Sequence, residues 1–164
     1  MRTRFAGAGV LVLLLAACDG MCGPLPAAPA ASVQHGVACV DVKAPHHAYV
    51  VVQHASGAWI QRCVGFAPGF IDAPTAMERA GIIFTTQPDE AHTICPIDGE
   101  PVEAKNCAPG GGQQWAMFIT VGGRWSQSRQ SLTQVRLTDG QVLGWRYVVA
   151  ADPAPSPPPR PDAV

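Results

Sequence analysis

The residues with the widest choice of chemistry in this chain are its six cysteines, at positions 18, 22, 39, 63, 95 and 107. Cys18 and Cys22 lie four positions apart in the stretch LAACDGMC, residues 15–22, directly after a run of Val and Leu. Thiols at such a place can carry a lipid, form a disulfide or bind a metal. Zinc would require a second Cys or His pair at comparable spacing. The sequence contains none, so lipid attachment and disulfide formation are the two alternatives.

The segment before Cys18 has the layout of a secretory signal. Arg2 and Arg4 come first, an apolar run follows over residues 5–15, and Ala16 and Ala17 precede the cysteine. The apolar run has only about a dozen residues, whereas a helix that spans a bilayer needs roughly 20. We therefore expect residues 1–17 to be a signal peptide that is removed when the protein is exported.

The stretch Leu15-Ala16-Ala17-Cys18 resembles the bacterial lipobox. The resemblance implies that Cys18 is acylated on its thiol, palmitate being a typical chain, and becomes the first residue of a lipoprotein. A single acyl chain anchors weakly, at about 0.8 kcal/mol per buried CH₂, so two or three chains are needed for stable anchoring. Asp19 then favours the periplasmic face of the inner membrane, if the cell has an outer membrane. The alternative is ordinary cleavage that leaves Cys18 as a thiol.

Export also makes the remaining cysteines candidates for disulfides. Cys39 and Cys63 flank a predicted hairpin, and Cys95 and Cys107 close a short loop, so we pair them in this way. Each bridge is expected to stabilise the fold by about 3 kcal/mol. Cys22 is then left over if Cys18 carries lipid. If Cys18 is not acylated, a Cys18–Cys22 bridge would complete three pairs.

Composition sets the domain boundaries. Residues 18–35 form a lipid anchor and an Ala/Pro-rich tether, residues 36–149 a single small domain, and residues 150–164 a Pro-rich tail that we expect to be disordered. The tail is either a solvated spacer or a docking segment for a partner. Charged residues make up 14% of the chain and the net charge is −1, which argues against nucleic-acid binding.

The domain is predicted to be α+β, of a small β-grasp-like type. A Val-rich run, a turn at residues 54–57 and a second run predict a β-hairpin over 48–66. Asp72 at an N-cap position and Gly81 at the stop predict one short helix. The remaining segments predict further strands, at residues 81–87 and 92–101, in a hairpin over 113–128 about Gly122-Gly123, and at 137–148 after an Asp-Gly turn.

The order of the motifs resembles the C-terminal domains of the transcobalamins. After the helix and Gly81, the chain carries the turn Ile97-Asp98-Gly99-Glu100 and the strand Trp115-Ala116-Met117-Phe118. The arm Gly123-Arg124-Trp125 and the closing stretch from Thr138 to Tyr147, TDGQVLGWRY, complete the series. Gln141 replaces the usual acidic residue of that stretch. The resemblance implies a module that captures a cobalamin-like or other small planar ligand and passes it to a membrane transporter.

Aromatic and basic residues are concentrated in the last third of the domain. An aromatic surface with arginines beside it can stack a planar ligand and hold its acidic groups. Trp115 and Trp145 have the strand spacing of core residues. The predicted ligand-binding residues are Phe118, Arg124, Trp125, Arg146 and Tyr147.

No pattern in the sequence indicates catalysis, and we expect no enzymatic activity. His46, His47, His54 and His92 have neither an i, i+4 partner nor a carboxylate cluster, so we interpret them as incidental surface residues without a metal. A nucleophile elbow and a phosphate-binding loop are also missing. No cofactor is predicted beyond a bound cobalamin-like ligand. The alternative to ligand capture is a structural envelope lipoprotein that binds a protein partner through an open sheet edge or its Pro-rich tail.

Overall fold

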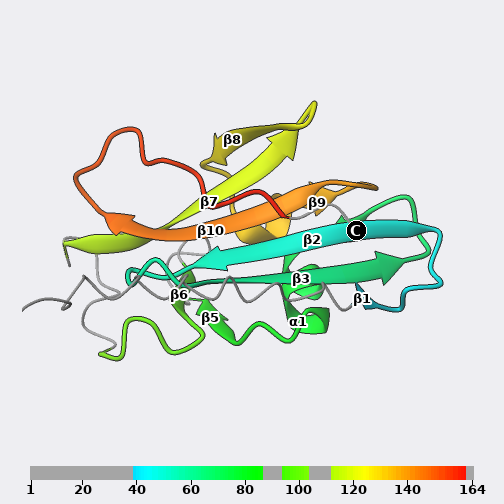
Figure 1. Cartoon of the computed structure of the whole chain (residues 1–164), viewed down its shortest axis with the longest axis horizontal. Helices are drawn as coiled ribbons and strands as arrows, with labels where there is room; N and C mark the ends of the chain where they lie inside the picture. The colour runs from blue at the N-terminus through cyan, green and yellow to red at the C-terminus, as the bar shows by residue number, and fades with distance from the viewer. Residues whose placement is uncertain (1–38, 87–93, 104–111, 162–164) are drawn as a thin grey trace, which may run out of the picture. The chain divides into compact units, whose positions relative to one another are not determined.

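A six-stranded mixed sheet forms the centre of the domain in the computed structural model (Figure 1). The structure describes residues 39–86, 94–103 and 112–161, all within one compact unit that spans residues 34–164. The strand order is β1-β3-β2-β10-β7-β8, and two-stranded sheets β4-β9 and β5-β6 accompany it. In chain order the elements are β1 (Cys39–Val40), β2 (His46–Gln53), β3 (Trp59–Phe66), β4 (Ile71–Asp72), α1 (Ala73–Arg79), β5 (Phe84–Thr86), β6 (Ile94–Ile97), β7 (Gln113–Val121), β8 (Arg124–Ser128), a 3₁₀ turn η2 (Leu132–Gln134), β9 (Arg136–Leu137) and β10 (Val142–Val149).

Both predicted hairpins are confirmed. β2 and β3 pair antiparallel from His46 opposite Phe66 to Gln53 opposite Trp59. β7 and β8 are joined at Gly122 and Gly123, which both have positive φ. A two-residue turn that matches the twist of its strands needs positive φ at both central positions, which glycine adopts without a steric penalty.

β10 connects the two hairpins at the centre of the sheet. It runs parallel to β2 and antiparallel to β7. Parallel neighbours such as β2 and β10 need a long connection between them. Part of that connection is the chain between β3 and β7, which contains α1 and the small strands β4, β5 and β6. The predicted α+β class is therefore confirmed.

The helix begins and ends where the sequence predicts. The Asp72 carboxylate accepts a hydrogen bond from the backbone N–H of Thr75 at 2.9 Å. Ala76 and Met77 are completely buried against the sheet side of the domain. Gly81 follows with a φ of +73°, a conformation that glycine adopts readily at a helix C-terminus. Arg79 in the last turn is paired with Asp41 of the segment after β1.

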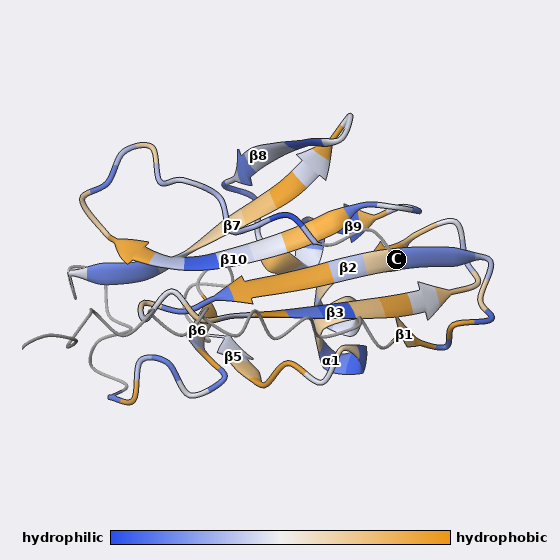
Figure 2. Ribbon diagram, in the orientation of Figure 1, coloured by the Kyte–Doolittle hydropathy of each residue, from blue (hydrophilic) through white to orange (hydrophobic). Residues whose placement is uncertain are grey.

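Strand alternation divides the side chains of the sheet into two sets. One face carries the main core, into which α1, β4 and β9 also contribute side chains. The other face carries a smaller apolar cluster of Ala116, Phe118 and Val148, with Trp125 packed against it. Figure 2 shows β2 changing from hydrophilic at its first residues to hydrophobic near its end, and Val50, Val51 and Val52 there are all fully buried.

The C-terminal segment, residues 152–161, differs from the expected disordered tail. Two of its prolines, Pro155 and Pro158, are buried, and the segment returns across the sheet near β10 (Figure 1, red). Proline-rich composition predicts an extended backbone, but it does not show that a sheet face in the same chain can hold the segment. Residues 162–164 of the predicted tail lie outside the described residues.

The predicted Cys39–Cys63 disulfide is present and joins β1 to β3, with Cα atoms 4.4 Å apart. Cys95 is also disulfide-bonded. Its predicted partner Cys107 lies outside the described residues, as do Cys18, Cys22, His92, the signal peptide and the tether. Within the described ranges, no helix is long and apolar enough to cross a membrane.

The Asp72 cap should stabilise the domain in a pH-dependent way. The Thr75 hydrogen bond lowers the pKa of Asp72 below its ordinary value of 3.8, so the folded state favours the carboxylate. We expect Asp72→Ala to reduce the free energy of unfolding at pH 7 by about 1 kcal/mol, as for other N-caps. Because a depressed pKa stabilises the fold only above the unfolded value, the difference from wild type should shrink as the pH falls below about 4.

Urea unfolding at pH 7 and pH 3 measures this difference. Glu78→Ala is the matched control, because Glu78 is an exposed carboxylate on the same helix outside the cap. A Glu78→Ala effect as large as that of Asp72→Ala would show that general helix charge, and not the cap, is responsible.

Candidate functional site

The structure brings three of the five predicted ligand-binding residues to one face. Phe118 on β7, Trp125 on β8 and Arg146 on β10 point to the side away from the main core. Arg124 and Tyr147 point to the opposite side, since each is next to one of these residues in its strand and successive side chains alternate. The five residues therefore do not form one surface, and their role in ligand binding stays a prediction. Tyr147 is buried against Trp115, with ring centroids 5.0 Å apart.

We call the surface formed by Phe118, Trp125, Gly144 and Arg146 the docking face. The ring of Trp125 meets Phe118 edge to face, with centroids 6.4 Å apart and planes at 75°. Phe118 lies opposite Gly144 in the β7–β10 register. Because Gly144 has no side chain, the rim of the Trp125 ring can lie over the backbone of β10: a Cβ at Gly144 would be 2.8 Å from Cη2 of that ring.

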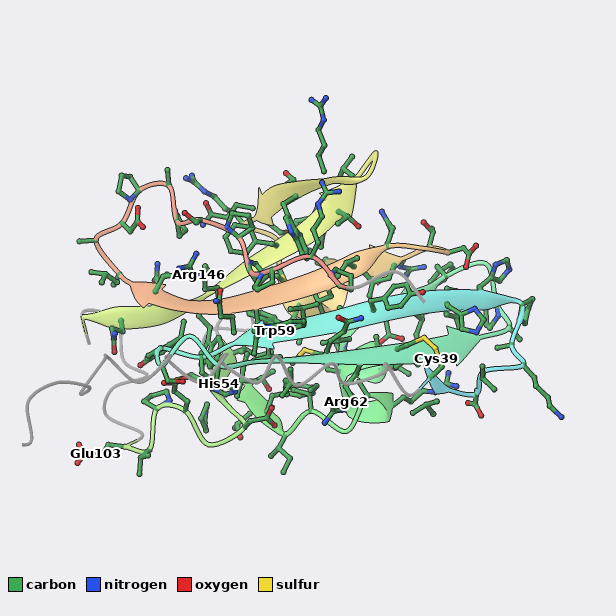
Figure 3. The ribbon with its side chains drawn as sticks, in the orientation of Figure 1. Cys39, His54, Trp59, Arg62, Glu103 and Arg146 are labelled. Carbon is green, nitrogen blue, oxygen red and sulfur yellow. A yellow bond between two sulfur atoms is a disulfide. The ribbon has the colours of Figure 1, made fainter. Side chains whose placement is uncertain are left out.

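The C-terminal segment occupies this face. The Arg146 guanidinium donates from Nη1 to the carbonyl of Ser156 at 3.0 Å and to that of Pro157 at 3.4 Å. Pro158 fills the space above Gly144, where a Cβ would come within 2.7 Å of its Cγ. Figure 3 labels Arg146 on β10, close to the returning segment. The docking face thus combines an aromatic wall, a bare stretch of backbone and a cation.

A second cluster lies at the end of the β2–β3 hairpin, where Glu100 accepts hydrogen bonds from several partners. Nδ1 of His54 is 2.8 Å from Oε2 of Glu100, with both side chains about one quarter exposed. The indole N–H of Trp115 donates to the Glu100 carbonyl at 2.9 Å. The His54 ring also meets Trp115 edge to face at 5.8 Å. These contacts hold the turn after β6 against the central sheet.

The cluster corrects the interpretation of His54 as an incidental surface residue, since its ring is paired and three-quarters buried. His54 and Glu100 are separated by 46 positions, and no local pattern signals that they meet. Trp115 is half-buried against the core and Trp145 is 2% exposed, as their strand spacing predicts. Among the described residues, no group of three or more His, Cys, Asp or Glu side chains could hold a metal ion.

A third feature is an open cleft of about 730 Å³ beside the Cys39–Cys63 disulfide. Its walls come from the segment after β1, the end of β3 and the helix, and include Val42, Lys43, Phe66, Pro68 and Arg79. Arg79 is held there by the carboxylate of Asp41. The sequence gives no indication of this cleft, because its walls are brought together only by the parallel pairing of β1 with β3.

Comparison of the chain with protein-family models, with curated proteins and with solved structures gives no match. The transcobalamin-like resemblance therefore stays a prediction, and the function has to be argued from the three features above.

The environment of Tyr147 gives a prediction about the Glu100 cluster. Burial raises the pKa of the Tyr147 phenol above its ordinary value of 10.0, and the nearby Glu100 charge raises it further. Glu100→Gln should lower the pKa of Tyr147, but only in part, because burial is the larger cause. The chain has two tyrosines, so phenolate absorbance in a Tyr49→Phe background reports Tyr147 alone. Glu78→Gln on the exposed side of α1 is the charge-matched control, and an equal shift there would contradict a local effect of Glu100.

Proposed function

We propose that this protein is a lipid-anchored binding module of the cell envelope. Acylated Cys18 would hold it at the membrane on the extracytoplasmic side, and the domain would bind its partner through the docking face. The lipobox-like stretch and the signal-like segment before it support the anchor. A disulfide in the domain fits an oxidising compartment outside the cytoplasm.

We further propose that the fold is β-grasp-like. In support, the four central strands have the order β3-β2-β10-β7. A hairpin comes first, a helix follows, and the final strand lies parallel to the first hairpin strand at the centre. The strands β1 and β8 extend this arrangement by one at each edge.

The observation that carries the binding role is the occupied docking face. Most sheet faces that lie away from a main core are polar and solvated, whereas this one has an apolar cluster with Trp125 packed on it and holds an extended segment. The face is therefore suited to recognising another chain, which favours an interaction lipoprotein over an enzyme. A membrane protein such as a transporter component would be within reach of a module tethered at Cys18.

The anchor is tested by the intact mass of the protein extracted from its native membrane. We expect a chain that begins at Cys18 and carries two or three acyl groups. Cys22→Ser is the matched control and should keep the acyl mass, because Cys22 does not follow the small residues of the lipobox. An unacylated chain in which Cys18 and Cys22 are disulfide-bonded would contradict the proposal.

A second candidate function, capture of a small molecule, is supported by the cleft beside the Cys39–Cys63 disulfide. Its volume of about 730 Å³ lies within the usual range of small-molecule sites, about 300–1,000 Å³. Lys43 in the lining could attract an acidic group of a ligand. This cleft, and not the predicted aromatic surface, would then be the site for a cobalamin-like or other planar ligand.

Equilibrium dialysis of the full chain against cyanocobalamin tests this candidate. If the cleft is the site, Val42→Arg should abolish retention, because Val42 lines the cleft and its side chain is 66% exposed. Val121→Arg is the matched control, since Val121 is similarly exposed, at 57%, on β7. Equal retention by both variants would place the ligand elsewhere, and no retention by wild type would remove cobalamin as the ligand.

A further inference from the structure

The two fully buried prolines of the C-terminal segment are three residues apart. Pro155 and Pro158 are buried, Ser156 and Pro157 between them are exposed, and Pro159 and Pro161 are half-buried. A polyproline II helix has three residues per turn, so every third side chain falls on the same side. The spacing of Pro155 and Pro158 is that of one edge of such a helix.

The docking face has the features that an extended proline-rich chain requires. Polyproline II has no internal hydrogen bonds, so its carbonyls are free to accept from a partner. Arg146 supplies donors to two consecutive carbonyls, those of Ser156 and Pro157. Trp125 supplies an aromatic wall, and the missing side chain at Gly144 leaves room for a proline ring. Domains that recognise proline-rich peptides use aromatic-lined grooves of this kind.

The C-terminal segment leaves one polar group of the docking face without a hydrogen bond. The indole Nε1 of Trp125 is buried without a hydrogen-bond partner among the residues that the structure describes. A buried donor without a partner is unfavourable. A proline-rich chain with a carbonyl placed to accept from this N–H would bind the face better than the present occupant does.

We propose that the docking face is a polyproline II recognition site, and that residues 155–161 are an intramolecular occupant that a proline-rich segment of another protein displaces. This deepens the proposed function, since it names the ligand class of the same face. A tethered segment competes at an effective concentration in the millimolar range. Peptides added in solution should therefore bind weakly until the attached segment is weakened.

The test measures fluorescence anisotropy of a labelled peptide with the sequence of residues 152–161, DPAPSPPPRP, added to full-length protein. In the variant Pro155→Gly/Pro158→Gly the attached segment loses its two buried prolines, and we expect the peptide to bind about tenfold or more tighter than to wild type. The matched control Pro153→Gly/Pro157→Gly removes two exposed prolines and should behave as wild type. Adding Arg146→Gln to the first variant should reverse the gain.

The same comparison made in the peptide does not depend on how the protein variants fold. The peptides are added at millimolar concentration to wild-type protein. A peptide with glycine in place of Pro153 and Pro157 should still bind, whereas one with glycine in place of Pro155 and Pro158 should not. Equal binding of the two peptides, or none of either, would overturn the inference. The inference would also be overturned if the attached segment were displaced only when the protein concentration is raised. That result would identify a second copy of the chain as the partner. An acylated Cys18 without peptide binding would leave the anchored module standing and refute only its ligand class.

Discussion

The parallel pairing of β10 with β2 joins the two hairpins, and the rest of the domain depends on it. Without this pairing β7 and β8 would have no connection to β2 and β3 within the sheet. β10 also serves both faces. Along β10 the side chains alternate between the two faces. Leu143 and Trp145 enter the main core, whereas Gly144 and Arg146 belong to the docking face. Any change that shifts the register of β10 by one residue would exchange these roles, so the core and the docking face are fixed by the same pairing.

The edges of the sheet are less suited to binding than its face. An edge strand that recruits another chain is usually long, flat and apolar. β1 has two residues and is disulfide-bonded to its neighbour, and β8 is short and polar except for Trp125, which packs on the docking face. Of the two routes to a protein partner that the sequence suggests, the open edge and the Pro-rich tail, these observations favour the tail and the face that holds it.

Local signals allowed much of the fold to be predicted. The Asp72 cap, the stop at Gly81 and the Gly122-Gly123 turn each depend on residues within a few positions of one another. Only part of the docking face could be predicted from the sequence. Strand alternation, applied strictly, would have placed Arg124 and Trp125 on opposite faces. The pairing of His54 with Glu100 and the fit of Pro158 over Gly144 depend on contacts between distant segments, which composition and periodicity do not report.

The C-terminal segment can leave the docking face without disturbing the main core or the strand pairing of the sheet. Proline has little backbone freedom to lose, so an incoming proline-rich chain is ordered on this face at a lower entropy cost than a Gly/Ser chain would be. At its start, the Asp152 N–H donates to the Val149 carbonyl at the end of β10. Over the docking face itself, the hydrogen bonds that the structure shows come from one side chain, Arg146, and the segment adds no strand to the sheet. The main core on the opposite face does not include it. Release of the segment would expose Trp125 and leave the β2–β10 pairing intact, which is the combination that an exchangeable occupant requires.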